Sequence, residues 1–319
     1  MVNKYLKFVK YAAATVALSC FALQAADAAP KFPRKQIQIV VPYAPGGASD
    51  TVARIYGKEL GKPVVVVNRT GASGAVGLES VKNSRPDGYT MSYMPVESTM
   101  ISALGLSDIS SDDFTFVCRI MTIPAAITVS ADAPWNTLEE FLQYAKENPG
   151  KLTVGNSGPG SIWNVAAASL EKATDVKFTH VPFDGAAPAI AALLGKNISA
   201  VAVSPSEVKT NVDAGQFKVL AVIGDQHSSV VPDVKTTKEL GIDVSAMGWG
   251  GFAVPKGTPD EVVQILNDAS AKVAQSADLK KLLADRGFEY AYLNGKDMDA
   301  FAKDQLTQYK ELIPQLIKK

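Results

Sequence analysis

The stretch QIQIVVPYAPGGASDTVARIYGKEL, residues 36–60, decides the fold class of this chain. Residues 36–43 are rich in β-branched side chains and predict a strand. Residues 49–60 carry apolar side chains at helical spacing and predict a helix, which Gly61 ends. The glycine pair of the quoted stretch lies between the two, so a glycine loop joins a strand to the start of a helix.

The same alternation of strand and helix continues along the chain, and it predicts an α/β fold with a mainly parallel sheet. Further strands are predicted at 63–68, 88–95, 125–130, 152–158, 178–183, 198–204, 217–224 and 249–255. Further helices are predicted at 74–84, 137–150, 161–174 and 187–196, and over the tail from Pro259.

The strand–helix pattern restarts near residue 125, which predicts two lobes without a flexible linker. We expect the chain to cross between the lobes near 123–130 and near 246–253, with the C-terminal helices returning to the first lobe. The predicted boundaries are 29–125 and 251–319 for lobe 1, and 126–250 for lobe 2.

Residues 1–28 have the features of a secretory signal peptide. The basic segment MVNKYLKFVK precedes the apolar run YAAATVALSCFAL, and Ala-Asp-Ala at 26–28 forms an A-x-A site. We expect cleavage after Ala28, which gives a periplasmic protein. The alternative is lipidation at Cys20, although the Ala-Leu-Ser that precedes it fits a lipobox poorly.

The composition excludes several classes of function. The chain has 319 residues, 47% of them hydrophobic, enough for one large or two medium domains. Its formal net charge of zero gives none of the basic character that nucleic-acid binding needs. No Cys/His cluster occurs, so we expect no metal and no cofactor. Cleavage leaves Cys118 as the single cysteine, which excludes an intramolecular disulfide and predicts an inert core thiol.

Four loops between a predicted strand and a predicted helix carry glycines. They are Gly46-Gly47, RTGASGAVG (69–77), GNSGPGSIW (155–163) and PFDGAAPA (182–189). In an open α/β sheet such loops gather at the carboxyl ends of the strands, where ligands bind. Glycine lets the backbone approach a ligand, and the free N–H groups of a helix start favour an anion. With two loops in each lobe, the pattern predicts one anion-binding cleft, although each loop alone is weak evidence because most such turns only reverse the chain.

These loops match no nucleotide-binding or catalytic motif. GPGSIW has Trp163 where a dinucleotide fingerprint has its last glycine, and GNSGP has Pro159 in the last place of a nucleophile elbow. An esterase-like enzyme would need Ser157 or Ser161 as nucleophile with His180 as base. We expect a structural role for the histidine and no catalytic residue.

Beyond the signal segment, the chain resembles the periplasmic solute receptors of tripartite tricarboxylate transporters, the Bug-type receptors. The resemblance rests on IQIVVPYAPGGASDTVAR, PVVVVNRTGASGAVGLESV, RPDGYT, THVPFDGAAPAIAALLGKNI and WGGFAVPKGTPDEVV, which cover nearly all of 36–264 in the family's order. It implies a two-lobed periplasmic binding protein, a venus flytrap of the type II-like class, with the crossing strands as hinge. It also implies a small carboxylate ligand that is held largely by loop backbone and bridging waters.

The resemblance implies a set of ligand-binding residues in the four loops. They are Tyr43, Gly46, Gly47, Ser49 and Asp50 in the first loop, Ala72, Ser73 and Gly74 in the second, Asn156, Gly158, Gly160 and Ser161 in the third, and Asp184 in the fourth. Some positions depart from the family, since Asn156 replaces a serine, Ile162 a proline and Asn164 a histidine, and Val203 stands where many members have an aspartate.

Several roles remain open at this level. Asp50 either caps its helix or touches the ligand, and Asp184 either accepts a hydrogen bond from the ligand or caps its turn. Trp163 either stacks on an aromatic acid or packs a lobe. Trp249, at a crossing strand, is expected to pack at the hinge.

The predicted function is that of an extracytoplasmic receptor and not of an enzyme. It captures a dicarboxylate or an aromatic acid and delivers it, as a monomer, to the membrane permease of a tripartite transporter. The alternative is a signalling receptor on the same fold that hands its liganded form to a sensor protein.

Overall fold

The computed structural model describes residues 32–316, so the predicted signal peptide and Cys20 lie outside the described residues. Residues from Lys35 onward form one compact unit, and the fold is described for that unit. None of the helices between residues 32 and 316 combines the length and the apolar character of a membrane span.

Ten strands of the described chain form one mixed sheet in the order β2-β1-β3-β9-β4-β7-β5-β6, with β8 and β10 also pairing with β4. Their bounds are β1 Ile37–Val41, β2 Val64–Asn68, β3 Thr90–Pro95, β4 Phe114–Ser130, β5 Thr153–Asn156, β6 Thr179–Pro182, β7 Ala200–Val203, β8 Phe217–Ile223, β9 Met247–Pro255 and β10 Glu289–Asn294. The pairs β1–β2, β1–β3, β5–β6 and β5–β7 are parallel, and the pairs of β4 and β9 are antiparallel.

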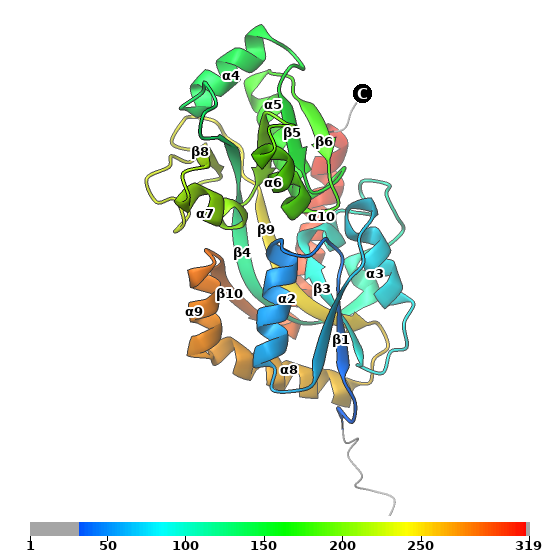
Figure 1. Ribbon diagram of the computed structural model, residues 1–319. Helices are drawn as coiled ribbons and strands as arrows, with labels where there is room; N and C mark the ends of the chain where they lie inside the picture. The colour runs from blue at the N-terminus through cyan, green and yellow to red at the C-terminus, as the bar shows by residue number, and fades with distance from the viewer. Residues whose placement is uncertain (1–31, 317–319) are drawn as a thin grey trace, which may run out of the picture. The chain divides into compact units, whose positions relative to one another are not determined.

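The long strand β4 belongs to both parts of the sheet (Figure 1). Its first part, 114–124, pairs with β9 and β10, and its last part, 125–130, pairs with β7 and β8. Strands β4 and β9 therefore join a first lobe, built on β1–β3, β9 and β10, to a second lobe, built on β5–β8. This is the two-lobed α/β architecture that the sequence predicts, while the exact boundaries at 125/126 and 250/251 stay a prediction.

Helices cover both parts of the sheet. They are α2 Ala48–Glu59, α3 Ala75–Lys82, α4 Leu138–Glu147, α5 Ile162–Thr174, α6 Ala186–Leu194, α7 Pro205–Asp213, α8 Asp260–Gln275, α9 Ala277–Asp285 and α10 Gly295–Leu316, with 3-10 turns η1 Ala72–Gly74, η2 Val96–Thr99 and η3 Ser111–Asp113. Helices α2 and α3 pack on the first lobe, and α5, α6 and α7 on the second. Helix α10 contacts β4, β10 and η2 and also α5, so the chain returns to the first lobe and touches the second.

The quoted stretch forms the expected unit, because β1 and α2 agree with the predicted strand and helix to within two residues. Strand β4 is longer than predicted. Pro124 argues against an unbroken strand because it cannot donate to the ladder, but it lies where pairing passes from β9 to the second-lobe strands. The tail was wrongly predicted as wholly helical, since 289–294 forms β10 on the edge of β4.

Candidate functional site

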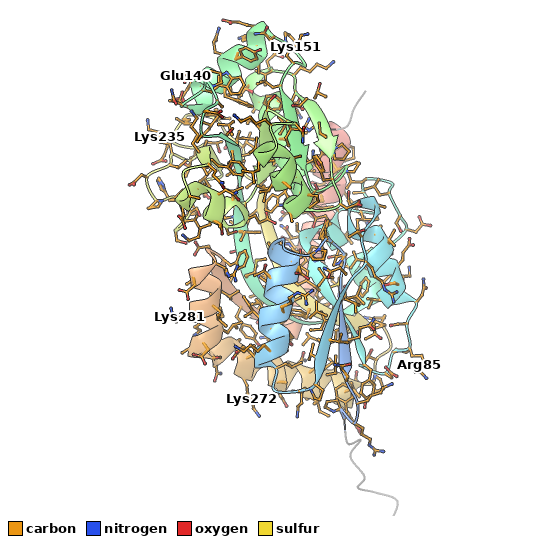
Figure 2. All side chains as sticks on the ribbon, in the orientation of Figure 1. Arg85, Glu140, Lys151, Lys235, Lys272 and Lys281 are labelled. Atoms are coloured by element: carbon orange, nitrogen blue, oxygen red, sulfur yellow. The ribbon has the colours of Figure 1, made fainter. Side chains whose placement is uncertain are left out.

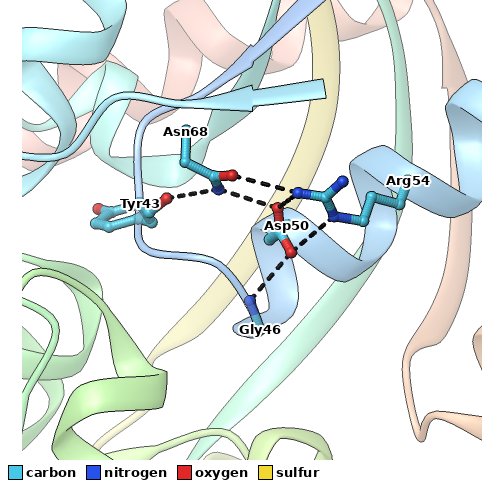
Figure 3. Close-up of polar contacts among 5 residues, drawn as sticks. All are labelled: Tyr43, Gly46, Asp50, Arg54 and Asn68. Atoms are coloured by element: carbon cyan, nitrogen blue, oxygen red, sulfur yellow. Dashed lines mark hydrogen bonds and ion pairs between the residues drawn. The ribbon is translucent and has the colours of Figure 1, made fainter. Parts of the chain in front are cut away.

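The loop before α2 is fixed by a network around Asp50 (Figure 3). The Asp50 carboxylate accepts hydrogen bonds from the Gly46 N–H (3.0 Å), from Asn68 Nδ2 (2.9 Å) and from the Arg54 guanidinium (2.9 and 3.0 Å). Burial raises the pKa of Asp50, but these donors outweigh it and lower the pKa below its usual value. Asn68 also donates to the Tyr43 carbonyl (2.9 Å), which ties the loop to strand β2.

A cavity lies where the loops of both lobes meet the two crossing strands, and we call it the tryptophan cavity. It leaves about 40 Å³ for the centres of water molecules, and about 10–15 Å³ is needed for one. The lining residues come from the loops after β1 and β5, from α2, β3, η2, α5, α6 and α7, and from both crossing strands. They are Tyr43, Ala44, Gly47, Ala48, Ser49, Tyr93, Pro95, Val96, Glu97, Met121, Ile123, Ser157, Ile162, Trp163, Ala186, Glu207, Gly248 and Trp249.

Three helices start at this cavity and present backbone donors to it. The N–H groups of Ser49 on α2, Trp163 on α5 and Ala186 on α6 belong to first turns and have no hydrogen-bond partner among the described residues. The N-terminus of a helix carries a partial positive charge, and its free N–H groups bind anions. The cavity is therefore equipped to bind a carboxylate without a basic side chain.

Two glutamates join the lobes across the cavity in opposite directions. Glu207, on second-lobe helix α7, accepts the N–H of Ala48 at the start of first-lobe helix α2 (3.1 Å). Glu97, on first-lobe turn η2, accepts the N–H of Ile162 at the start of second-lobe helix α5 (2.7 Å). Each carboxyl group thus binds a helix N-terminus of the other lobe, and both line the cavity.

The Glu97 carboxyl group titrates near neutral pH. Its side chain is 3% exposed, and burial raises the pKa to about 7 against the lowering effect of the Ile162 N–H, with a smaller rise from the charge of Glu207. Burial and then Glu97 also raise the pKa of Tyr43. Because the Tyr43 hydroxyl donates to the Ser73 carbonyl (3.0 Å), a protonated Glu97 can donate to the Tyr43 oxygen without competing for that hydrogen.

A second, wider cavity lies beside the first and shares Tyr43 and Ser157 with it; we call it the loop cavity. It leaves about 460 Å³ for the centres of water molecules. Ser73 Oγ donates to the Pro159 carbonyl and links the lobes at this cavity. Its lining residues are Tyr43, Gly71, Ala72, Ser73, Gly74, Ser157, Gly158, Pro159, Pro182, Phe183, Asp184 and Pro188.

The predicted site residues are divided between these two cavities. Tyr43, Gly47, Ser49 and Trp163 line the tryptophan cavity, and Tyr43, Ala72, Ser73, Gly74, Gly158 and Asp184 line the loop cavity. Gly46, Asp50, Asn156, Gly160 and Ser161 line neither of them. The Asp184 side chain is exposed, while its carbonyl accepts the Ala44 N–H (3.0 Å).

The residues that line neither cavity shape the loops. Asn156 is fully buried, and its Oδ1 accepts the Gly158 N–H (3.1 Å). Asn164, which replaces a family histidine, accepts the Gly160 N–H (2.9 Å) and contacts His180 (3.0 Å). Gly160 has a φ of +73°, a conformation that favours glycine.

The serine–histidine arrangement of a hydrolase is not formed. The Ser161 hydroxyl accepts the Asn164 N–H (3.2 Å) and so caps α5. The two ring nitrogens of His180 contact Asn164 and Glu171 (2.7 Å), which is the structural role expected for this histidine. Cys118 is buried, and burial raises the pKa of its thiol to about 12, so the thiol is unreactive near neutral pH.

Sequence reasoning missed Glu97, Glu207 and Trp249 as cavity residues. The pattern Ser-Pro-Ser-Glu at 204–207 is a capping box with proline at the first helical position, and it could have revealed helix α7 and Glu207. Glu97 follows strand β3 in an apolar context, where a lone carboxyl group is unusual.

Comparison with known proteins places the chain among solute receptors. The model of the "Tripartite tricarboxylate transporter family receptor" matches residues 50–317. A UPF0065 protein from the gbd 5' region of Cupriavidus necator is 33% identical over 96% of this chain and 94% of its own. A ligand-free TctC solute-binding protein from Polaromonas is 41% identical, with a TM-score of 0.65 over 89% of this chain and 100% of its own.

More distant structures superpose more closely. The periplasmic binding protein BugD is 28% identical, with a TM-score of 0.85 over 89% of this chain and 98% of its own. MatC from Rhodopseudomonas palustris with bound malate is 26% identical, with a TM-score of 0.81 over 88% of this chain and 99% of its own. Another R. palustris protein, with adipate, is 25% identical, with a TM-score of 0.84 over 90% of this chain and 98% of its own.

Proposed function

Because the chain belongs to the family of tripartite tricarboxylate transporter receptors, which are periplasmic solute-binding proteins and not enzymes, we propose that it captures a small organic carboxylate of the dicarboxylate or aromatic acid class. The observation that carries this proposal is the meeting of three helix N-termini at the tryptophan cavity, with free N–H groups on Ser49, Trp163 and Ala186. Malate and adipate in two related proteins support the same ligand chemistry.

Two tryptophans extend the proposal to aromatic acids. Trp163 and Trp249 both line the cavity, and both are buried. Flat indole surfaces favour the stacking of an aromatic ring. The stacking role that the sequence left open for Trp163 therefore belongs to this proposal, as do the site residues that line either cavity.

Capture involves opening and closing of the lobes about β4 and β9. In the described conformation Glu97 and Glu207 bridge the lobes across the tryptophan cavity, so their separation would widen the access to it. The ligand-free Polaromonas protein, although 41% identical, gives a lower TM-score than BugD at 28%. A different arrangement of similar lobes produces such a difference, which supports a hinge motion.

The liganded receptor then delivers its acid to the permease subunits of a tripartite transporter. The N-terminal 28 residues serve as the secretion signal, and the mature protein works as a monomer. Intact-mass measurement on periplasmic extract tests the first point: a mass that begins at Ala29 is expected, and a diacylated species that begins at Cys20 would contradict it.

A thermal-shift screen of mono-, di- and aromatic carboxylates tests the proposed function. An acid present at 100 times its Kd adds about 2.7 kcal/mol of stability and raises Tm by several degrees. Matched amides and alcohols of the same carbon skeletons are the control. If these neutral compounds raise Tm as much as the acids do, the carboxylate proposal is wrong.

A further inference from the structure

The tryptophan cavity combines anion-binding helix ends with two acidic side chains. We propose that the captured acid also carries a protonated nitrogen, which lies against Glu97 and Glu207. The inference rests on the proposed capture of a small carboxylate, and it replaces the dicarboxylate or aromatic acid class by small acids that also carry an ammonium group.

The charge of the cavity lining is the first argument. Glu97 and Glu207 are its charged members, and no lysine, arginine or histidine occurs among the described residues that line it. Basic side chains such as Lys151, Lys235 and Lys272 point outward from the molecule (Figure 2). A purely anionic ligand would therefore meet two acidic groups with no opposing cation nearby, which is unfavourable at low dielectric.

Both carboxyl groups keep acceptor capacity for a donor of the ligand. A carboxylate has about four lone-pair positions. Glu207 uses them for the Ala48 N–H, the Ser204 N–H (3.1 Å) and the Ser204 hydroxyl (3.0 Å). Glu97 uses one of them for the Ile162 N–H, while the hydrogen of the Tyr43 hydroxyl goes to the Ser73 carbonyl. Each group can therefore accept one further hydrogen bond, and a protonated amine supplies such donors.

Trp249 gives an independent sign of the ligand's other end. It lines the same cavity and is 3% exposed, and its indole N–H has no hydrogen-bond partner in the described chain. Buried donors in folded proteins are nearly always paired, so this N–H calls for an acceptor such as a carboxylate oxygen. With Ser49 and Trp163 N–H groups nearby, the cavity offers donors for a carboxylate and acceptors for an amine.

The alternative is a dicarboxylate that shares a proton with Glu97. The two cases differ in their pH dependence, because Glu97 has a pKa of about 7. The titratable groups that face it are Tyr43, Tyr93 from β3, Tyr309 from α10 and Glu207 from α7. The tyrosines stay neutral near pH 7, since their pKa values are raised. Binding of a zwitterion needs ionised Glu97, so its affinity rises with rising pH. Binding of a dicarboxylate through a shared proton needs protonated Glu97, so its affinity falls with rising pH.

Calorimetric titration with matched ligands tests the inference on the full mature protein. One series is γ-aminobutyrate, butyrate, glutarate and butylamine, and the other is p-(aminomethyl)benzoate, p-toluate, terephthalate and p-methylbenzylamine. In at least one series the zwitterion is expected to bind at least tenfold more tightly than its monoacid, its diacid and its amine. Its affinity should rise about tenfold from pH 6 to pH 8, as the ionised fraction of a group with pKa 7 does.

Two variants locate the nitrogen. Glu97→Gln keeps an oxygen for the Ile162 N–H and should lower zwitterion affinity at least tenfold and abolish the pH dependence. Glu171→Gln is the matched control, because Glu171 also accepts a backbone N–H, that of Phe178, but lies outside the cavity. It should leave affinity unchanged. Melting curves show whether both variants fold. If Glu97→Gln does not fold, Glu207→Gln takes its place in the same test.

Each remaining outcome overturns a definite statement. Tighter binding of a monoacid or diacid than of the zwitterion refutes the inference and leaves the carboxylate receptor intact. Tightest binding of an amine without a carboxylate refutes the proposed function as well. If no compound of either series binds, both the inference and the carboxylate proposal are wrong for ligands of this size.

Discussion

Replacement of Gly47 by valine separates ligand binding from loop stability. Gly47 is the N-cap of α2 with φ −79° and ψ −179°, an extended conformation open to any residue. A Cβ there would lie 3.6 Å from Glu207 Oε1, an ordinary contact. The stability cost is therefore that of an apolar N-cap, about 0.5–1 kcal/mol.

The effect on binding should be larger than the effect on stability. The two methyl groups of valine extend beyond the Cβ at a residue that lines a cavity with room of only about 40 Å³. They take the place of a carboxylate oxygen beside the Ser49 N–H, so we expect at least a tenfold loss of affinity, about 1.4 kcal/mol.

Calorimetric titration beside a melting curve measures both effects, and Gly61→Ala is the control. Gly61 has a φ of +65° with no other atom within 4 Å of an added Cβ, and it lies outside both cavities. Alanine there should cost about 1–2 kcal/mol of stability through backbone strain and leave Kd unchanged. An unchanged Kd for Gly47→Val with a lowered Tm would refute the reasoning and make 41–50 a simple turn.

Three further predictions concern pH and shape. Asp50→Asn should destabilise the protein by about 1.5–3 kcal/mol at pH 7 through lost charged hydrogen bonds. Because the folded-state pKa of Asp50 is lowered, the difference in stability should begin to shrink near about pH 4 and vanish only below the folded-state pKa in urea titrations; a constant difference would contradict this. The pKa of Glu97 is raised to about 7, so between about pH 4 and pH 7 the folded protein keeps a proton on Glu97 that the unfolded chain has lost. The free energy of unfolding of the wild type should therefore fall by up to about 3 kcal/mol from pH 4 to pH 8. Glu97→Gln should remove this fall, and an identical pH profile in both proteins would show that another group causes it. Small-angle scattering should show a smaller radius of gyration at saturating ligand, and an unchanged profile would count against hinge closure.

The fold was largely predictable because its local signals agree with one another. The apolar run of β1, the glycine pair and the amphipathic pattern of α2 each specify their own structure. Strand β10 was not predictable in this way, because the six residues 289–294 lie between strong helices and form a strand only through pairing with β4. Tertiary pairing overrides a weak local preference there.

The candidate site was predictable only in part. Glycine-containing loops that precede helices indicate free backbone N–H groups, so the first loop and its neighbours were identified from the sequence. The two glutamates were not, because Glu97 and Glu207 are 110 positions apart in sequence and meet only when the lobes fold together. Their importance comes from burial and from the helix ends that they bind, and neither property can be read from one residue.

A crystal structure of the complex tests the central claim most directly, with the acid that raises Tm most in the thermal-shift screen. The account predicts that the ligand contacts both lobes within the tryptophan cavity. One of its carboxylate oxygens should lie within hydrogen-bond distance of the N–H of Ser49, Trp163 or Ala186. A ligand held by one lobe alone, or with its carboxylate bound to lysine or arginine side chains away from these helix ends, would contradict it.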